Sequence, residues 1–173
     1  MNVVGEFEKV PFVEFRDAVE KMHITKDGIS EHYDLKELLS IWYAIKIPTR
    51  ATSGSAGHDF AMPFDLNIGP NPTVFPTGIR CKIEPGWMLV CCPRSGLGFK
   101  HGTRLRNTLG IIDSDYYAAD NFGHICVSMS ADDCIDLKQG DKFMQGIFIP
   151  YGVTAESASV GTDRTGGFGS TDD

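Results

Sequence analysis

From about residue 45 onward the sequence is a succession of short apolar segments separated by turn-forming residues. The segments "TVFPTGIRCKI", "WMLVCC", "HICVSMS" and "KFMQGIFIPY" are rich in β-branched and aromatic residues, and "IGPNP", "EPG" and "KQGD" stand between them. β-Branched and aromatic residues favour strands, whereas Gly, Pro, Asn and Asp favour the turns that join strands. Many short strands at this spacing predict an antiparallel sandwich, barrel or jelly roll.

The first 44 residues follow a different pattern. In "EFRDAVEKM" the apolar residues Phe15, Val19 and Met22 recur at helical spacing, and "DLKELLSIWY" repeats that signal. Asp34, followed three residues later by Glu37, resembles a capping box, which indicates the start of a helix. We therefore expect two short helices, joined by a loop around "TKDGIS", ahead of an all-β domain.

Composition limits the class of protein. A chain of 173 residues suits one domain, and its 42% hydrophobic content is ordinary for a globular protein. No apolar run approaches the roughly 20 residues that span a bilayer, and the N-terminus does not resemble a signal peptide. We expect a cytoplasmic protein without a membrane partner. The five cysteines form no C-x-x-C pair, so buried free thiols are the expectation.

The formal net charge of −7 argues against a nucleic-acid partner, because such proteins present a basic surface. A small anionic ligand requires only a local concentration of positive charge. The segment 94–106 provides one, because it contains several basic residues and no acidic ones: Arg94, Lys100, His101, Arg104 and Arg106.

Two stretches between predicted strands combine small and charged residues. In "PRSGLGFKHG", Gly96 and Gly98 allow a ligand to approach the backbone, and Arg94 and Ser95 offer what a phosphate chain needs. The pattern is not a Walker loop, so a plain turn between strands is the alternative. In "NTLGIIDSDYYAAD" an apolar strand leads into Asp113, where a rigidly held carboxylate could act as a general base. The tip of a β-hairpin is the alternative there.

Two further stretches are informative. Gln145 is the one polar residue inside the apolar strand of "GDKFMQGIFIPY", and it either satisfies backbone groups or reaches into a site. The tail "GTDRTGGFGSTDD" places Arg164 and Phe168 among glycines. Such a segment suits a lid, in which the phenyl ring stacks on a planar ring and the arginine meets a phosphate. A disordered terminus is the alternative.

Together and in this order, these stretches resemble the five motifs of the trimeric dUTP pyrophosphatases (dUTPases). The segments "AGHDF", "PRSGLG", "GIIDSDY", "GDKFMQGIFIP" and "RTGGFGST" are similar to the first to the fifth motif, and they extend from about Ile45 to Thr171. One such motif is weak evidence, whereas five in order are highly specific.

The resemblance implies a jelly-roll-like β-barrel fold and a homotrimer whose active sites are shared between subunits. It divides the chain into a helical N-terminal extension (1–44), a dUTPase β domain (45–160) and a flexible C-terminal arm (161–173) that closes a neighbour's site. The implied reaction is hydrolysis of dUTP to dUMP and pyrophosphate, with Mg²⁺ bound to the triphosphate.

The resemblance also implies roles for individual residues. Asp113 would activate the water that attacks the α-phosphorus, and Tyr116 would pack under the deoxyribose and exclude a 2′-hydroxyl. Asp59 would lie near the water shell of the metal or brace the site. The uracil and its ring partner would involve Asn107, Gly110, Ile111, Ile112 and Phe168. The phosphate chain would involve Arg94, Ser95, Gly96, Gln145, Arg164, Gly167 and Ser170.

Three features depart from the family pattern. Ala118 stands where a glycine is usual, and the strand resumes only near His124, which implies an insertion or a reshaped hairpin after Tyr116. The spacing between Arg164 and Phe168 is one residue shorter than usual. The helical extension lies outside the motifs.

Two alternative functions follow from these features. A dCTP deaminase shares the fold, but no glutamate lies between Glu84 and Glu156 to serve the deamination. A nucleotide-gated regulatory protein would bind a partner through the helices, with Phe15, Leu38, Leu39 and Trp42 as exposed anchors. Packing of these apolar residues on the β domain is the expectation that we favour.

Overall fold

The computed structural model describes residues 2–28 and 30–155. This part of the chain is mainly β-structure. Its strands are β1 (Gly5–Lys9), β2 (Thr49–Arg50), β3 (His58–Ala61), β4 (Leu66–Ile68), β5 (Thr73–Pro76), β6 (Ile79–Ile83), β7 (Trp87–Pro93), β8 (Arg104–Leu105), β9 (Gly110–Ile112), β10 (Cys126–Ser130), β11 (Ile135–Leu137) and β12 (Lys142–Pro150). Its helices are α1 (Phe12–Lys21), α2 (Leu35–Ala44), α3 (Ser95–His101) and the 3-10 helix η1 (Ser114–Ala118).

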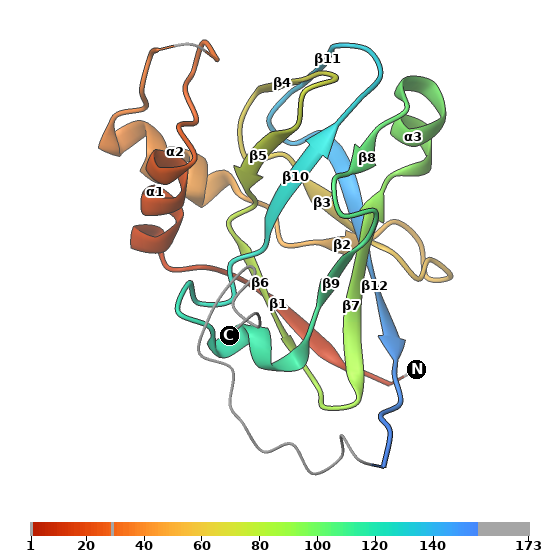
Figure 1. Cartoon of the computed structure of the whole chain (residues 1–173). Helices are drawn as coiled ribbons and strands as arrows, with labels where there is room; N and C mark the ends of the chain where they lie inside the picture. The colour runs from red at the N-terminus through yellow and green to blue at the C-terminus, as the bar shows by residue number, and fades with distance from the viewer. Residues whose placement is uncertain (1, 29, 156–173) are drawn as a thin grey trace.

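The strands form antiparallel sheets, as the sequence predicts. The largest has the order β2-β3-β12-β7-β9, with the long strand β12 paired to β3 on one side and to β7 on the other. A second sheet has the order β5-β10-β8, and two smaller pairs join β1 to β6 and β11 to β4. The fold is therefore the all-β barrel or jelly-roll type, with helices at its margins (Figure 1).

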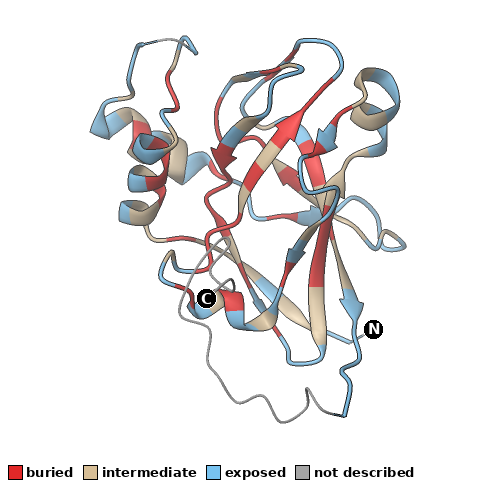
Figure 2. Ribbon diagram, in the orientation of Figure 1, coloured by how far each residue is buried: buried red, intermediate tan, exposed pale blue. Residues whose placement is uncertain are grey.

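The core lies between these sheets. Buried residues gather along the strands (Figure 2). In β6 and β11 they alternate with more exposed residues, whereas in the central strand β7 residues 89–91 are buried in succession. Phe60, Phe75, Phe143 and Met144 are 0–1% exposed, and the Phe75 and Phe143 ring centroids lie 5.3 Å apart. Burial of a large apolar side chain stabilises the fold by about 1.5–3 kcal/mol, so these residues dominate the folding energy.

The two predicted N-terminal helices are present, and the capping box is confirmed. The Asp34 side chain accepts from the Glu37 backbone N–H at 2.9 Å, and the Glu37 side chain accepts from the Asp34 N–H at 2.7 Å. Strand β1 was not predicted, and neither were the helices α3 and η1. Residues Gly5–Lys9 form β1, which pairs antiparallel with β6 from Gly5 opposite Ile83 to Lys9 opposite Ile79.

The helices pack on the β domain. Figure 1 shows α1 and α2 together on one side of the β structure, with α3 on the opposite side. Phe15 and Leu38 are 0% and 3% exposed, and Leu39 and Trp42 are partly buried. The hypothesis that these residues are exposed anchors for a partner is therefore wrong, and the favoured packing is confirmed. Within the described residues no helix has the length and apolar character required to cross a bilayer.

Candidate active site

The predicted phosphate-binding stretch forms the start of a helix. Arg94 is the N-cap of α3, and Ser95 and Gly96 are exposed in its first turn. The helix ends at Gly102, whose left-handed backbone (φ 58°) is a conformation that glycine adopts without strain. The exposed N–H groups of this turn, with the Arg94 side chain beside them, suit an anionic group. The stretch is thus more than a plain turn between strands.

Asp59 holds Arg94 in place. Its side chain is only 7% exposed, and its two oxygens face two different cations. Oδ1 lies 3.2 Å from Arg94 Nε, and Oδ2 accepts from Lys142 Nζ at 2.9 Å. A nearly buried carboxylate is stable only when it is paired in this way. The contacts favour the bracing role for Asp59 over a place in a metal's water shell.

Gln145 lies beside the same pair. In the sheet it is opposite Asp59 on β3 and opposite Cys92 on β7, one residue before Pro93. Its side chain packs against the backbone of Gly57, where an added Cβ would lie 2.3 Å from Gln145 Oε1. The glycine of "AGHDF" therefore makes room for this glutamine. Strand register thus brings together Asp59, Arg94 and Gln145, which are far apart in the sequence.

The predicted uracil-reading residues lie along a large cavity. Gly110, Ile111 and Ile112 form β9, and Asn107 precedes it in an exposed turn. A cavity of about 990 Å³ separates these residues from β10. Its lining includes the predicted Asn107, Gly110, Ile111 and Ile112, the β10 residues Cys126, Val127 and Ser128, and the α1 residues Glu14, Asp17 and Lys21.

The cavity lies between two different sheets. It is bounded by two strands that do not pair with each other, since β9 pairs with β7, and β10 pairs with β5 and β8. β10 has a neighbour on both sides, whereas β9 is the last strand of its sheet, so the open edge of β9 leaves backbone N–H and C=O groups available to a planar ring with donors and acceptors along its edge.

Asp113 and Tyr116 follow β9 directly. Asp113 is exposed and lies at the strand end, as predicted, and it is the N-cap of η1. Tyr116 is 5% exposed, and its hydroxyl donates to the backbone oxygen of His124 at 2.9 Å. The alternative of a hairpin tip is wrong, because the segment forms a 3-10 helix rather than a two-strand turn.

The residues after Tyr116 form a compact loop. Residues between η1 and β10 fold back on the turn, where Asn121 Nδ2 donates to the Tyr116 hydroxyl at 2.8 Å. Gly123 has a φ of +68°, and a Cβ there would lie 2.7 Å from the Cα of Tyr117. Only glycine fits this position, so the loop is tightly packed on the turn.

The predicted residues thus form two groups rather than one. The proposed phosphate-binding residues lie at the start of α3, after the end of β7. Asp113 lies near the other end of β7, because it follows Ile112, which pairs with Leu89 near the start of that strand. At a rise of about 3.3 Å per residue, this register separates Arg94 from Asp113 by roughly 15–20 Å. Figure 1 shows α3 and the turn after β9 at opposite ends of the β structure. A triphosphate chain does not span that distance.

Some predicted residues are not tested by the geometry. Arg164, Gly167, Phe168 and Ser170 lie outside the described residues. Among residues 2–28 and 30–155, no group of three or more His, Cys, Asp or Glu side chains is arranged to hold a metal ion. Asp59 is poorly placed as a ligand of Mg²⁺, because both of its oxygens already face cations. The described residues can therefore hold Mg²⁺ only through a phosphate chain that they bind.

Sequence reasoning missed several residues of the site. Lys142 pairs with Asp59 across 83 positions of the chain, and Gly57 makes room for Gln145. Glu14, Asp17 and Lys21 were assigned to no site, yet they line the cavity. A local pattern reveals none of these, although the glycine in "AGHDF" signals a close approach.

Comparison with known proteins agrees with this geometry. A family model described as dUTPase matches residues 44–172, which is more than half of the chain. A deoxyuridine 5′-triphosphate nucleotidohydrolase of Lactococcus lactis is 36% identical over 132 residues, covering 73% of this chain and 88% of that protein. One from Shewanella baltica is 42% identical over 134 residues, covering 71% and 84%.

Solved structures give the same result. The dUTPase from Streptococcus mutans is similar with a TM-score of 0.57 and 32% identity, covering 62% of this chain and 88% of that one. A mutant dUTPase from phage phi11 of S. aureus, which coordinates a structural Mg(II) ion, has a TM-score of 0.56. It is 17% identical and covers 64% of this chain and 87% of that one, so it supports the fold alone. With five motifs in order, the matching fold and these relatives, the chain belongs to the dUTPase family.

Proposed function

We propose that this protein hydrolyses dUTP to dUMP and pyrophosphate. The observation that carries the proposal is the arrangement at β9, which lines the cavity and continues along the chain into an exposed carboxylate and a buried tyrosine. The names of the relatives, which are nucleotidohydrolases of deoxyuridine 5′-triphosphate, support it. Nothing in the described residues favours deamination.

In the proposed reaction Asp113 acts as the general base. Its exposed carboxylate accepts a proton from a water molecule whose oxygen attacks the α-phosphorus. The bond between the α-phosphorus and the oxygen bridging to the β-phosphate breaks, and pyrophosphate leaves with the electron pair. The chain supplies the water's position and direction, and positioning accounts for much of the rate in phosphoryl transfer.

Specificity for the nucleoside is proposed to come from β9 and Tyr116. Backbone groups around Gly110–Ile112 would pair with the uracil edge, and cytosine would leave mismatched donors and acceptors unpaired. The Tyr116 ring would lie under the deoxyribose and leave no space for a 2′-hydroxyl. Its hydroxyl is bonded to the His124 carbonyl, which fixes the ring.

The phosphate chain is proposed to bind at the start of α3. Arg94, Ser95, Gly96 and Gln145 would contact the phosphate oxygens, and the Asp59 pair would keep Arg94 oriented. Mg²⁺ would arrive with the substrate, bound to phosphate oxygens and water, as this strongly hydrated ion commonly is. It would neutralise charge on the triphosphate. In the C-terminal arm, Phe168 and Arg164 are proposed to close over the ring and the phosphates.

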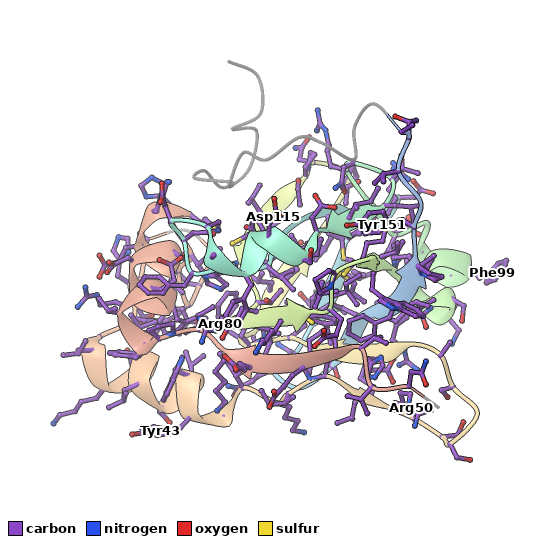
Figure 3. The ribbon with its side chains drawn as sticks, turned by 90° about the horizontal axis from the view of Figure 1, so that it is seen from below. Tyr43, Arg50, Arg80, Phe99, Asp115 and Tyr151 are labelled. Carbon is purple, nitrogen blue, oxygen red and sulfur yellow. The ribbon has the colours of Figure 1, made fainter. Side chains whose placement is uncertain are left out.

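The assembly is proposed to be a homotrimer with shared sites. The separation of Arg94 from Asp113 supports this, because one chain does not bring both groups to one triphosphate. Phe99 supports it as well. This large apolar side chain is 93% exposed, and Figure 3 shows it projecting from α3 away from the body of the chain. Exposed aromatic residues are enriched at protein interfaces.

A nucleotide panel tests the proposed function. Pyrophosphate release from dUTP, dCTP, dTTP and UTP would be measured with and without Mg²⁺, together with ammonia release from dCTP. We expect Mg²⁺-dependent release from dUTP far above that from the others. Asp113→Asn should abolish it, whereas Asp133→Asn, an exposed carboxylate outside the site, should not. An active Asp113→Asn enzyme, or ammonia from dCTP, would refute the proposal.

A further inference from the structure

Two polar contacts connect the N-terminal extension to the turn that carries Tyr116. The extension lies outside the motifs that place the chain in its family, and its two anchors come from different elements, β1 and α1. Both end on residues between Tyr117 and His124, next to the side chain that is proposed to contact the sugar. We call them the Glu8 anchor, made by Glu8, Arg80 and Tyr117, and the Glu14 anchor, made by Glu14 and His124.

The Glu8 anchor holds the residue after Tyr116. Tyr117 OH donates to Glu8 Oε2 at 2.8 Å, and Arg80 donates to the same oxygen from Nε at 2.9 Å and from Nη2 at 2.6 Å. The Arg80 guanidinium also lies over the Tyr117 ring, 4.3 Å from its centroid. Figure 3 shows η1, marked by Asp115, beside the strand that carries Arg80. Tyr117 is thus fixed at its hydroxyl and on its ring face.

The Glu14 anchor passes through a fully buried histidine. His124 is 0% exposed, and its Nε2 accepts from the Gly78 backbone N–H at 2.9 Å. In the neutral ring Nδ1 therefore carries the proton, and it donates to Glu14 Oε1 at 3.1 Å. The backbone oxygen of the same His124 accepts the Tyr116 hydroxyl at 2.9 Å. His124 therefore contacts α1 through its side chain and Tyr116 through its backbone oxygen.

The loop between the anchors transmits these restraints to Tyr116. Asn121 donates from Nδ2 to the Tyr116 hydroxyl at 2.8 Å and to the His124 oxygen at 3.3 Å. A Cβ on Gly123 would lie 2.9 Å from the Tyr116 carbonyl oxygen, so the loop has no room to move toward the turn. The hydroxyl and backbone of Tyr116 are both held by a segment that the extension fixes.

We propose that Glu14 and Tyr117 are positioning residues that set discrimination between deoxyribose and ribose. The inference rests on the proposed function, in which the Tyr116 ring contacts the sugar. Exclusion of a 2′-hydroxyl by a ring depends on where that ring lies, because a shift of about 1 Å opens space for one oxygen atom. Glu14 also lines the cavity, whereas Tyr117 does not, so Tyr117 tests positioning through Tyr116 apart from any direct contact of the extension with the substrate.

The test compares variants by their ratio of kcat/KM for dUTP to kcat/KM for UTP. Glu14→Ala removes the acceptor for His124 Nδ1–H, Glu14→Gln retains an acceptor, and Tyr117→Phe removes one hydroxyl while keeping the ring on Arg80. Glu20→Ala is the matched control, because Glu20 is an exposed residue of the same helix. We expect the ratio to fall about tenfold in Glu14→Ala and Tyr117→Phe, to recover largely in Glu14→Gln, and to stay at the wild-type value in Glu20→Ala.

The outcomes separate the possibilities. A merely structural role would lower thermal stability and reduce both substrates' rates equally, so an unchanged ratio in folded Glu14→Ala and Tyr117→Phe overturns the proposal. If Glu14→Ala does not fold, Tyr117→Phe decides alone, since it removes a single oxygen. A wild-type protein without dUTP hydrolysis would instead refute the proposed function. If the wild-type protein prefers dUTP to UTP and the variants show the same preference, only this inference is refuted.

Discussion

Substitution of Asp59 by asparagine should weaken the proposed phosphate-binding residues around Arg94 without unfolding the protein. The Asp59 carboxylate is 7% exposed and faces Arg94 Nε at 3.2 Å and Lys142 Nζ at 2.9 Å. Asparagine retains one acceptor and nearly the same volume, but it loses the charge that both cations face. Arg94 would then lose the partner that fixes its orientation.

The magnitude follows from how exposed the cations are. A hydrogen bond to a charged group contributes about 1.5–3 kcal/mol, but the Arg94 and Lys142 side chains are 41% and 44% exposed, so water screens both pairs. We therefore expect about 1 kcal/mol from each contact, or a loss of roughly 2 kcal/mol in the free energy of unfolding. In a domain of this size that lowers Tm by about 4–8 °C. Loss of phosphate positioning should lower kcat/KM by about tenfold to a hundredfold.

The assay is pyrophosphate release under dUTP and Mg²⁺ titrations, with Asp65→Asn as the control. Asp65 pairs with Lys138 at 3.0 Å and accepts from the Gln139 N–H at 2.8 Å, but it is half exposed and outside the site. We expect the control to retain wild-type kcat/KM, and the Mg²⁺ concentration for half-maximal rate to be unchanged in Asp59→Asn. Wild-type kcat/KM in a folded Asp59→Asn protein would refute the bracing role. A large rise in the Mg²⁺ requirement would instead support a place in the metal's water shell.

Two further predictions concern packing and pH. In Gly57→Ala the new Cβ would displace the Gln145 side chain, so KM for dUTP should rise several-fold with little change in Tm. Gly54→Ala, which meets nothing within 4 Å, should change neither, and an unchanged KM in Gly57→Ala would contradict the role of Gln145. Partial burial raises the pKa of Glu8, but bonds from Tyr117 and Arg80 and the nearby Lys82 outweigh it, so this pKa lies below the ordinary 4.5. The stabilisation by Glu8 should thus be complete above pH 4.5 and disappear as pH falls through the lowered pKa, seen as a Tm difference between wild type and Glu8→Gln that closes in acid. A difference that does not narrow as the pH falls below 4.5 would refute this assignment.

Local patterns predicted most of the fold. The strands at β5, β6, β7, β10 and β12 follow from short segments rich in β-branched and aromatic residues between turn formers, and the start of α2 follows from the Asp34–Glu37 capping box. The strand β1 did not follow from such a pattern, because "GEFEK" contains a single large apolar residue. Its strand conformation comes from pairing with β6, which lies more than 70 residues further along the chain. Such long-range pairing leaves no local periodicity.

The site was predictable in its parts and not in its arrangement. Residue types and spacing predicted that Arg94 and Asp113 carry chemistry, and in the structure they stand at a helix start and a strand end. Their separation follows only from the antiparallel register of β7 and β9. The Glu14–His124 pair was equally hidden, because it joins residues 110 positions apart and His124 has no motif around it. Tertiary structure decides such pairs.

Activity in mixtures of two inactive variants shows whether the active sites are shared between chains. The Arg94→Ala variant lacks the proposed phosphate-binding arginine, and the Asp113→Asn variant lacks the proposed catalytic base, so each protein alone should be inactive. If each site takes these groups from different chains, denaturing and refolding the two together should restore roughly one quarter of the wild-type pyrophosphate release, because random mixing gives that fraction of sites intact groups. Mixtures that refold into assemblies but remain inactive would contradict shared sites. Such a result would mean that Arg94 and Asp113 of one chain serve the same site.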